Sequence, residues 1–412
     1  MGTARPAVMG LMLLAGLVPA GQGAEVPPAA PLAVTLARDG NGFAVDLYAR
    51  LRGQQAGNLF CSPQSIATAL AMTSLGARGE TAAEMARTLH LSVSQARLPE
   101  AYAAFLATLQ APKDGTWELS VANRLWGQHG TDFLAPFLEA VRVGFGAELG
   151  RVDFAQAPDA ARQEINRWVE AETRRKIQNL LAPGSVTPLT RLVLTNAIYF
   201  RADWAERFDP KATSDQPFAL PGGSTRTVPL MFRKVRAGYA GLPDARAKLL
   251  ELPYRGDALS MVVLLPDAAD GLGDLEAQLT AAGLEGWLAA ATRREVLVYL
   301  PRFSVESRFG LAETLAAMGM PAAFSAQADF SGMNGRRDLS VSAVVHAARV
   351  EVDERGTEAA AATGVAVGVS AARPQEPPVF RADHPFVFAI RDRRTGAVLF
   401  LGRLLDPRPA AG

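Results

Sequence analysis

Helical spacing of apolar residues dominates the first half of this sequence and strand-like spacing the second half. This division restricts the fold more than any other feature. Apolar residues recur at helical spacing from about residue 42 to residue 109, and again in the amphipathic stretch 158–181. The strand-like runs that follow are residues 191–200, 259–266, 295–303, 343–354, 384–392 and 397–406. No composition change marks an internal domain boundary, so the order predicts an α+β fold with a large mixed or antiparallel sheet.

One late segment, "GTEAAAATGVAVGVSAARPQEPP" from Gly356 to Pro378, combines the composition of a loop with the pattern of a strand. Its small residues and terminal prolines are typical of an exposed loop that proteases can reach. Small or β-branched residues nevertheless occupy every second position, at Thr357, Ala359, Ala361, Thr363, Val365, Val367 and Val369. This period is typical of a strand with one buried face. A helix start is the other interpretation of "TEAAAA", but Gly364 and the valines after it do not continue a helix.

The N-terminal segment predicts export. Residues 1–24 have a basic start, an apolar run, and then small residues suited to cleavage between Ala20 and Ala24. We interpret them as a signal peptide, followed by a flexible, proline-containing arm at residues 25–41. The predicted location is therefore secreted or periplasmic.

Composition excludes several kinds of partner. The 412 residues include 42 Lys and Arg against 41 Asp and Glu, so no charge excess attracts nucleic acid or an anionic membrane. Cys61 is the only cysteine, so no intrachain disulfide can form, and we expect it to pack as a small buried hydrophobe. The Ala- and Arg-rich composition, without any Asn-x-Ser/Thr sequon, favours a bacterial source.

Motifs of the common enzyme classes are absent from the sequence. The four histidines, His90, His129, His346 and His384, show no metal-ligand spacing, and there is no nucleophile elbow or P-loop. We predict no enzyme activity, no metal and no cofactor. A serine hydrolase using His346 or His384 stays open as an alternative, because such triads assemble from distant residues.

Several segments in their order along the chain resemble the serpin family, in its inhibitory form. They are "NLFCSPQSIATALAM" (58–72), "GARGETAAEM" (76–85), "INRWVEAETRRKIQNLL" (165–181), "LVLTNAIYFRADW" (192–204), "LELPYRGDALSMVVLLP" (250–266), "LPRFSVESRFGLAETLAAMGMPAAFSAQADFSGM" (300–333), "VVHAARVEVDERGTEAAAATG" (344–364) and "FRADHPFVFAIRDRRTGAVLFLGRLLDP" (380–407). The resemblance implies one α+β domain over residues 42–408, with three β-sheets and about nine helices. It also implies an exposed reactive loop at residues 354–379.

The resemblance implies an irreversible suicide-substrate inhibitor of serine proteases. The protease cuts the reactive loop and stays covalently attached, while the cut loop enters the large sheet as a new strand. A loop with a strand's pattern is then expected. The implied partner is the target serine protease, and the protein is expected to be a monomer with loop–sheet polymers as an off-pathway form. A non-inhibitory serpin acting as a carrier and an inhibitor of papain-like cysteine proteases are the alternatives.

Loop insertion places physical demands on the entering residues. About a dozen newly paired residues release on the order of 10 kcal/mol through hydrogen bonds and burial. Entering side chains must therefore be small and uncharged, because a charge at Thr357 or Ala359 would cost several kcal/mol on burial.

The resemblance assigns roles to individual residues. The hinge comprises Glu354, Gly356, Thr357, Glu358, Ala359, Ala360, Ala361 and Ala362. Counting on from Glu354 places the reactive bond at Ser370–Ala371, with neighbouring bonds from Val369 to Arg373 open. Small residues here suit elastase-like or subtilisin-like targets, whereas Pro374 makes the bond after Arg373 a poor substrate.

A second group of residues is assigned to the moving sheet. The resemblance places Ser62, Ser65, Asn196 and His346 in a polar cluster, the shutter, beneath the point where the sheet parts. It places Trp204 at the breach, the top of the large sheet, where the hinge first enters that sheet. In isolation Trp204 would be a core residue and His346 a buried, hydrogen-bonded histidine.

Overall fold

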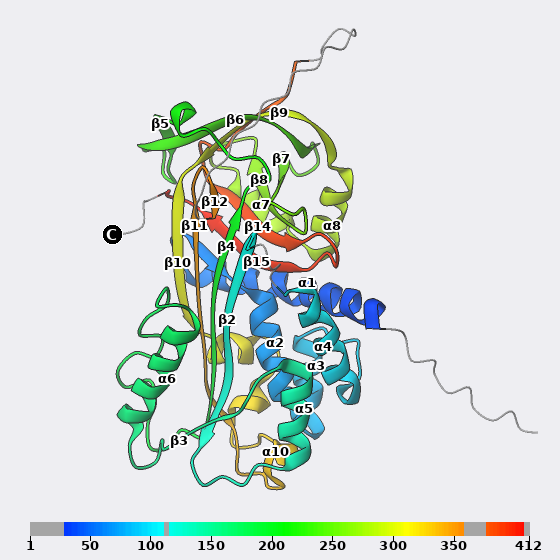
Figure 1. Ribbon diagram of the computed structural model, residues 1–412, viewed down its shortest axis with the longest axis vertical. Coiled ribbons are helices and arrows are strands. Elements are labelled where there is room, and N and C mark those ends of the chain that lie inside the picture. The colour runs from blue at the N-terminus through cyan, green and yellow to red at the C-terminus, as the bar shows by residue number, and fades with distance from the viewer. Residues whose placement is uncertain (1–28, 111–114, 358–375, 408–412) are drawn as a thin grey trace, which may run out of the picture.

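The computed structural model describes residues 29–110, 115–357 and 376–407 (Figure 1). The α-helices of this part are α1 (Ala29–Gln54), α2 (Pro63–Ser74), α3 (Gly79–Thr88), α4 (Leu98–Thr108), α5 (Ala135–Phe145), α6 (Pro158–Glu172), α7 (Leu272–Gln278), α8 (Ala281–Ala290), α9 (Ala312–Met318) and α10 (Ser331–Asn334). Among the described residues, no helix combines the length and hydropathy that a membrane crossing requires.

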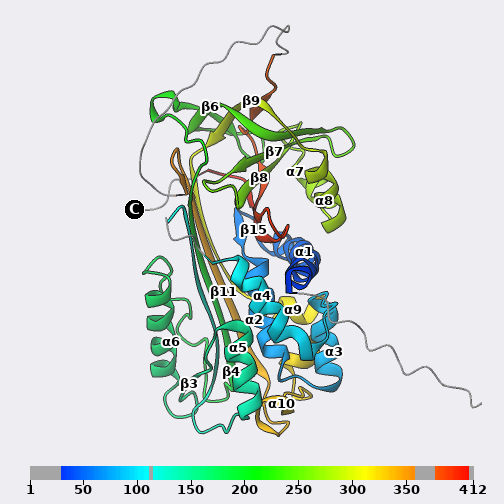
Figure 2. The same cartoon turned by 45° about the vertical axis from the view of Figure 1, so that its right-hand side comes forward.

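A six-stranded sheet forms the long axis of the molecule. Its order is β10 (Phe303–Gly310), β11 (Val341–Val352), β4 (Leu192–Asp203), β2 (Trp117–Gln128) and β3 (Gly150–Val152), with the short β12 (Gly356–Thr357) paired to β4. The central strands β4 and β11 run parallel to each other, whereas β10 and β2 pair antiparallel to them. Helices α2 and α5 lie on one side of this sheet and α6 on the other (Figure 2).

A nine-stranded sheet forms the upper part of the molecule in Figure 1. Its order is β1 (Leu59–Cys61), β15 (Val398–Leu404), β14 (Phe386–Asp392), β8 (Leu259–Pro266), β7 (Ala247–Pro253), β6 (Thr225–Leu242), β9 (Thr292–Pro301) and β13 (Val379–Arg381), with β5 (Ser214–Ala219) paired to β6. The α+β fold is confirmed. The described strands form two sheets where three were expected, because the 18-residue β6 pairs in turn with β5, β9 and β7 and joins them.

Helix α2 connects the two sheets. All its residues are buried, and it packs against β2, β4 and β15. Its N-cap is Ser62, whose hydroxyl accepts a hydrogen bond from the backbone N–H of Ser65. Cys61 is fully buried beside this helix, as expected, and burial raises the pKa of its thiol. The N-terminus of α2 therefore lies where the two sheets meet.

Two boundaries differ from the sequence-based prediction. Residues 29–41, predicted as part of a flexible arm, form the start of α1, and Leu32 and Leu36 are buried one turn apart. Pro31 is compatible with this because proline is tolerated in the first turn of a helix. The helix predicted at 158–181 ends at Glu172, because Arg174 and Arg175 adopt positive φ angles of 49° and 63°.

Candidate functional site: the sheet seam and the hinge

A row of polar side chains crosses the middle of the six-stranded sheet. His346 of β11 is opposite Asn196 of β4, and Asn196 is opposite Asn123 of β2. Paired residues on neighbouring strands project their side chains to the same face. Ser62 and Ser65, at the start of α2, complete the cluster from below this face. Asn196 and His346 are completely buried, so the cluster lies inside the protein.

Hydrogen bonds within the cluster determine which ring nitrogen of His346 carries the proton. The backbone N–H of Ser62 donates to its Nε2 over 3.1 Å, so Nε2 carries no proton. The proton is therefore on Nδ1, which donates to Oδ1 of Asn196 at 2.5 Å. Asn196 in turn donates through Nδ2 to Oγ of Ser65 at 2.7 Å, and also to Oδ1 of Asn123. The bond between His346 and Asn196 spans the seam between β11 and β4.

The pKa of His346 follows from this environment. Complete burial disfavours the imidazolium and lowers the pKa to about 3, and the donor already facing Nε2 opposes a second proton. In the unfolded chain the pKa of histidine is about 6.5. Between the two values the unfolded chain binds more protons, so this contribution to stability is complete above pH 6.5 and decreases as the pH falls toward 3.

We expect acid to destabilise the protein by about 1.4 kcal/mol per pH unit through His346 alone. The variant His346→Gln retains hydrogen-bonding groups but does not titrate. Urea unfolding at pH 6.5 and pH 5 should therefore show the wild type losing about 1.6 kcal/mol more stability than the variant, because the unfolded histidine is already half protonated at pH 6.5. Carboxylates titrate in both proteins, so their contributions to the loss of stability cancel when the two proteins are compared. Equal losses in the two proteins would contradict a neutral, buried His346.

The hinge residues begin in an opening at the upper end of the same seam. On β4, residues Leu192 to Tyr199 pair with β11, whereas Asp203 and Ala202 pair with Gly356 and Thr357 of β12. The other edge of Ala202 is already occupied by Trp117 of β2. Because a strand has two edges, β12 must lie on the side of β4 that faces β11. The chain thus turns back from β11 and starts down between the two parallel strands.

Glycine is required at the first paired position of β12. Gly356 has a φ angle of 139°, which favours glycine. A Cβ atom there would lie 2.2 Å from the carbonyl oxygen of Ala202. Asp353 closes the turn before it, because its backbone N–H donates to the Gly356 carbonyl at 3.0 Å and its carboxylate accepts from the Arg355 N–H at 2.8 Å. The backbone is therefore shaped to bring β12 against β4.

Trp204 holds this turn from the end of β4. Its indole Nε1 donates to the carbonyl of Asp353 at 2.9 Å, and its backbone N–H donates to the carbonyl of Arg355 at 3.0 Å. The ring is buried and stacks on Tyr254, with centroids 4.7 Å apart. The Phe208 N–H adds a bond of 2.9 Å to the carbonyl of Glu354. Trp204 is therefore both a core residue and a direct support of the hinge.

Glu354 is a buried carboxylate immediately before the hinge turn. It is 5% exposed and accepts hydrogen bonds from Nε of Arg302 at 2.6 Å and from Oγ1 of Thr213 at 2.5 Å. Burial opposes ionisation, but these donors outweigh it and keep the pKa of Glu354 below its usual value. The ion pair with Arg302 ties the chain entering the loop to the start of β10, and the hydrogen bond from Thr213 ties it to the segment before β5.

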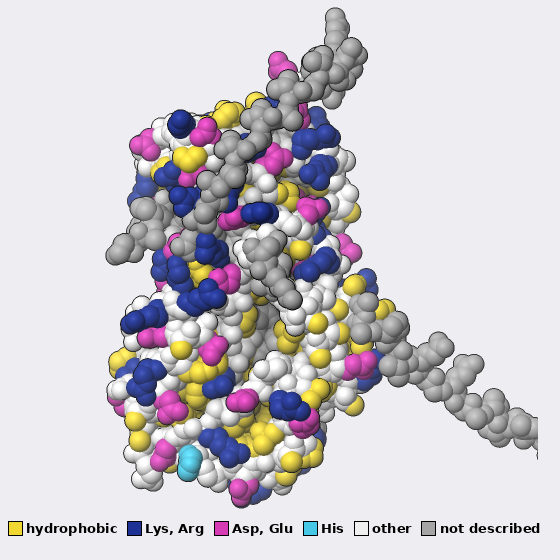
Figure 3. Space-filling view, viewed as in Figure 1, with side chains coloured by type: hydrophobic (Ala, Val, Ile, Leu, Met, Phe, Trp, Pro, Cys, Tyr) yellow, Lys and Arg dark blue, Asp and Glu magenta, His cyan; other side chains and the backbone are white. Residues whose placement is uncertain are grey.

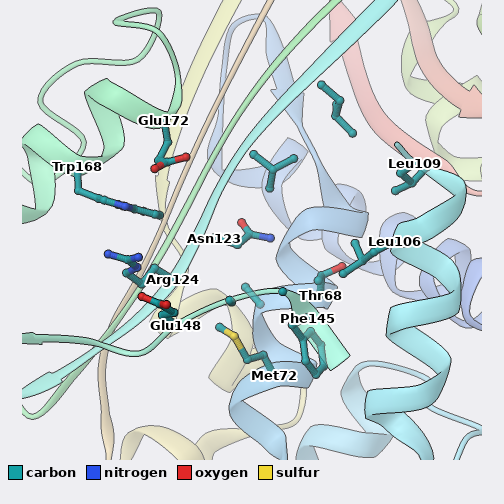
Figure 4. Close-up of a pocket in the computed structure, with 15 residues that line it drawn as sticks. Thr68, Met72, Leu106, Leu109, Asn123, Arg124, Phe145, Glu148, Trp168 and Glu172 are labelled. Atoms are coloured by element: carbon teal, nitrogen blue, oxygen red, sulfur yellow. The ribbon is translucent and has the colours of Figure 1, made fainter. Parts of the chain in front are cut away.

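A cavity of about 490 Å³ lies beside the polar cluster, and Asn123 forms part of its wall (Figure 4). Met72 and Phe145 contribute an apolar side to the cavity. On the other side Arg124 stacks on Trp168 of α6, at 4.3 Å from the ring centroid. Side chains do not fill this space, which borders β2 at the level of the cluster.

The structure brings together most of the predicted site residues that it describes. Ser62, Ser65, Asn196 and His346 are in one hydrogen-bonded cluster, and Trp204, Glu354 and Gly356 are together at the top of the seam. Asn123 and Asp353 were not predicted, although the register of β2 against β4 places Asn123 in the row. The residues that lie outside the described part of the chain are Glu358, Ala359, Ala360, Ala361, Ala362, Ser370 and Ala371.

The alternative of a serine hydrolase finds no support in the two histidines that it would use. The ring of His346 contacts Asn196 and the backbone of Ser62. The ring of His384 contacts Asp383 and the carbonyl of Pro266. In the described ranges neither ring is hydrogen-bonded to a serine hydroxyl.

Comparisons with known proteins agree on one family. The family model for Serpin (serine protease inhibitor) matches residues 38–407. The leukocyte elastase inhibitor of Bos taurus is 46% identical over 373 residues, which cover 89% of this chain and 97% of that protein. The leukocyte elastase inhibitor of Homo sapiens is 42% identical over 376 residues, with the same coverage of 89% and 97%. The crystal structure of Serpin48, a highly specific serpin of the insect Tenebrio molitor, matches with a TM-score of 0.82 and 32% identity, covering 90% of this chain and 98% of that one.

The same comparisons correct the predicted location. Leukocyte elastase inhibitors are intracellular serpins, so the prediction of a secreted or periplasmic protein is wrong. Residues 1–24, on which that prediction depended, lie outside the described residues and before the family match. The predicted bacterial source is not tested by these relatives, which come from two mammals and an insect.

Proposed function

The chain belongs to the serpin family, and from this we propose that it is an irreversible suicide-substrate inhibitor of serine proteases. The proposed targets are elastase-like or subtilisin-like enzymes that accept small residues at the cut. The name of the bovine and human relatives, leukocyte elastase inhibitor, supports elastase-like targets.

One observation carries this proposal: the chain after β11 already enters the seam between β4 and β11. If the chain after β12 continued to pair in this way, it would form a strand antiparallel to both β4 and β11. Eight residue pairs of parallel ladder between β4 and β11 would be replaced by two antiparallel ladders. Antiparallel pairing is slightly more stable per residue, and the number of backbone hydrogen bonds increases. Insertion is therefore favourable once the loop is released at its far end.

The proposed chemistry uses the protease's own first step. The protease serine attacks the carbonyl carbon of Ser370, the peptide bond to Ala371 breaks, and Ser370 becomes an ester on the enzyme. The loop then moves down the seam and carries the enzyme along. Separation of β4 from β11 breaks the hydrogen bond between His346 and Asn196, so the polar cluster sets part of the barrier. The enzyme stays bound if insertion precedes hydrolysis of the ester.

The proposed resting state is a monomer whose loop waits outside the seam. An open seam can equally accept the loop of a second molecule, which gives loop–sheet polymers as an off-pathway form. Insertion of the molecule's own loop and of another molecule's loop both add a strand between β4 and β11. Conditions that weaken the hydrogen bonds of the polar cluster therefore favour polymers as well as insertion.

Mixing the purified protein with pancreatic elastase and with subtilisin tests the proposal. We expect a complex that survives denaturing electrophoresis, together with a released C-terminal peptide that begins at Ala371. Intact mass spectrometry identifies both products and locates the reactive bond. Cleavage without any covalent complex, for both enzymes, would contradict inhibition by this mechanism for small-residue proteases.

A further inference from the structure

The C-terminal end of the proposed reactive loop is held by a short edge strand. β13 has three residues, and among the strands that the structure describes it pairs with β9 alone. The pairing is parallel and runs from Val379 to Arg381. One further backbone bond of 2.9 Å joins the Ala382 N–H to the Tyr299 carbonyl. A ladder this short has little stability of its own, so side chains must help to hold the strand.

His384 lies shortly after β13 and has an acceptor at each ring nitrogen. Its Nε2 is 2.8 Å from the carbonyl oxygen of Pro266 at the end of β8, and its Nδ1 is 2.9 Å from Oδ1 of Asp383. Burial opposes ionisation of Asp383, but hydrogen bonds from His384 and Arg381 keep the pKa of that carboxyl below its usual value. An imidazole that faces two acceptors donates from both nitrogens, so His384 carries two protons and a positive charge.

The charge of His384 is the opposite of what the structure assigns to His346. Nε2 of His346 accepts a hydrogen bond from the Ser62 N–H, so that ring is neutral. The side chain of His384 is only 12% exposed, and its bonds to the described residues go to oxygen acceptors. Acid adds a proton to His346, whereas alkali removes one from His384. The two rings therefore respond to opposite changes of pH.

Asp383 connects His384 to β13. Its Oδ2 accepts from Nε of Arg381 at 2.8 Å, and its backbone carbonyl accepts from the Ala219 N–H of β5 at 2.8 Å. The guanidinium of Arg381 also lies 4.7 Å from the centre of the Tyr299 ring on β9. Through Asp383 and His384, β13 is therefore connected to the end of β8, a strand that is not its neighbour in the sheet.

The charges around His384 determine how the ring responds to pH. Lys and Arg side chains are mixed with Asp and Glu side chains on the upper part of the molecule (Figure 3). Besides Asp383, the charged residues on the elements that meet here are Arg381 on β13, Asp215 on β5, Arg246 and Lys248 around the start of β7, and Asp267 after β8. Lys248 and Asp267 pair with each other at 3.5 Å. In the described ranges Asp383 is therefore the one charged group that is hydrogen-bonded to His384.

We propose that the positively charged His384 is a positioning residue that holds β13 in its sheet, and that a rise in pH weakens this hold. A neutral ring has one N–H, so after losing a proton to water it donates to Pro266 or to Asp383 but not to both. The inference rests on the proposed function, because β13 holds the end of the loop that lies away from the seam. With β13 free, the uncut loop follows β12 into the seam, and the molecule loses its inhibitory activity without meeting a protease.

Nuclear magnetic resonance of protein labelled with ¹⁵N in its histidines tests the charge directly. At pH 6 the ring of His384 should show a proton on both nitrogens, and the variant His384→Arg identifies the signals by their absence. Between pH 6 and pH 9 they should move to the positions of a neutral ring. A ring with a single proton at pH 6 would overturn the proposal.

Hydrogen exchange measures how firmly β13 is held. The Ala382 N–H bonds to Tyr299 across the ladder, so its exchange reports the opening of β13. After correction for the intrinsic effect of pH, we expect its protection in the wild type to fall about tenfold from pH 6 to pH 9, because one charge-assisted bond is lost. His384→Gln, which is uncharged, should show the low protection at both pH values. His384→Arg, which keeps its charge and two donors, should show the high protection at both.

A matched control removes another histidine that is paired with an aspartate. His90 follows α3 and its Nε2 lies 2.7 Å from Oδ2 of Asp46 on α1, away from β13. His90→Gln should keep the protection of Ala382 within twofold of the wild type at both pH values. An equal fall in the wild type and in His384→Arg would overturn the proposal, and so would unchanged protection in His384→Gln.

Active protease connects the hold on β13 to inhibition. Uncut protein is kept at 37 °C at pH 6 or pH 9, returned to neutral pH, and tested for covalent complexes with elastase. The wild type should lose this capacity about tenfold faster at pH 9, and His384→Arg should lose it slowly at both pH values. Equal rates in the wild type at the two pH values would overturn the proposed role. Absence of covalent complexes in every sample would reject the inhibitory function alone, because resonance and hydrogen exchange report on His384 and β13 without any protease.

Discussion

Replacing Ala359 by glutamate is expected to convert the protein from an inhibitor into a substrate. Continuing the observed register of β12 against β4, which pairs Thr357 with Ala202, places position 359 opposite Phe200. Phe200 is completely buried, so a carboxylate entering beside it would lose its hydration without a partner. That cost is several kcal/mol, and each 1.4 kcal/mol added to the insertion barrier slows insertion about tenfold. Hydrolysis of the ester then occurs first.

Titration of active protease measures this result. The wild type should inactivate the enzyme at close to one molecule per enzyme, and Ala359→Glu should require at least ten, with cleaved protein accumulating instead of covalent complex. The same register places Glu358 opposite Arg201, at the half-exposed end of the strand. Glu358→Ala is therefore the matched control and should leave the stoichiometry within twofold. A loss of inhibition in the control, or none in Ala359→Glu, would contradict insertion in this register.

The polar cluster shows what the sequence could predict and what it could not. Ser62, Ser65, Asn196 and His346 were assigned through family resemblance, and the structure places them within hydrogen-bonding distance. Asn123 was missed because the strand that carries it, β2, was not among the predicted strands. Polar residues interrupt its alternation, and its burial depends on pairing with β4 and not on its own pattern. Long-range register is the information that a single sequence lacks.

Boundary errors have a related cause. The arm predicted at residues 25–41 is helical from Ala29, because Leu32 and Leu36 find apolar partners in the core that outweigh the nearby prolines. The helix predicted at 158–181 stops at Glu172 although its apolar spacing continues. Ile177 and Leu180 are buried, but they cover the sheet from irregular chain after the helix and not from the helix itself. The apolar spacing of this segment therefore continues beyond the end of its helix.

The hinge illustrates how a functional feature contradicts local preference. The segment after Gly356 has a helix-favouring run of alanines, yet Gly356 and Thr357 are in a strand. Tertiary contacts decide this, because Trp204 and Asp353 fix the turn and the open edge of β4 provides the pairing partner. A chain that must exchange a loop for a strand needs residues that accept both states. Alanine favours a helix, so the loop residues meet that need through their small, uncharged side chains and not through any preference for a strand.

Cutting the loop of the free protein is expected to raise its melting temperature by roughly 10 °C or more. A cut between Val369 and Arg373 releases the strand, which can then pair along the whole seam. About a dozen paired residues at about 1 kcal/mol each stabilise the product by on the order of 10 kcal/mol. Unfolding entropy of about 2.1 cal/mol/K per residue converts this into a shift of that size for a chain this long.

Calorimetry of intact and cut protein from one preparation measures the shift. Ala359→Glu, cut at the same bond, should gain much less, because its charge opposes entry at the position opposite Phe200. A gain in the wild type without covalent complexes would mean that the loop inserts but that the proteases tried are not the targets. No gain in the wild type would mean that β12 is the end of a fixed hairpin and that the seam between β4 and β11 does not open. The melting temperature of the cut protein therefore tests loop insertion independently of any choice of protease.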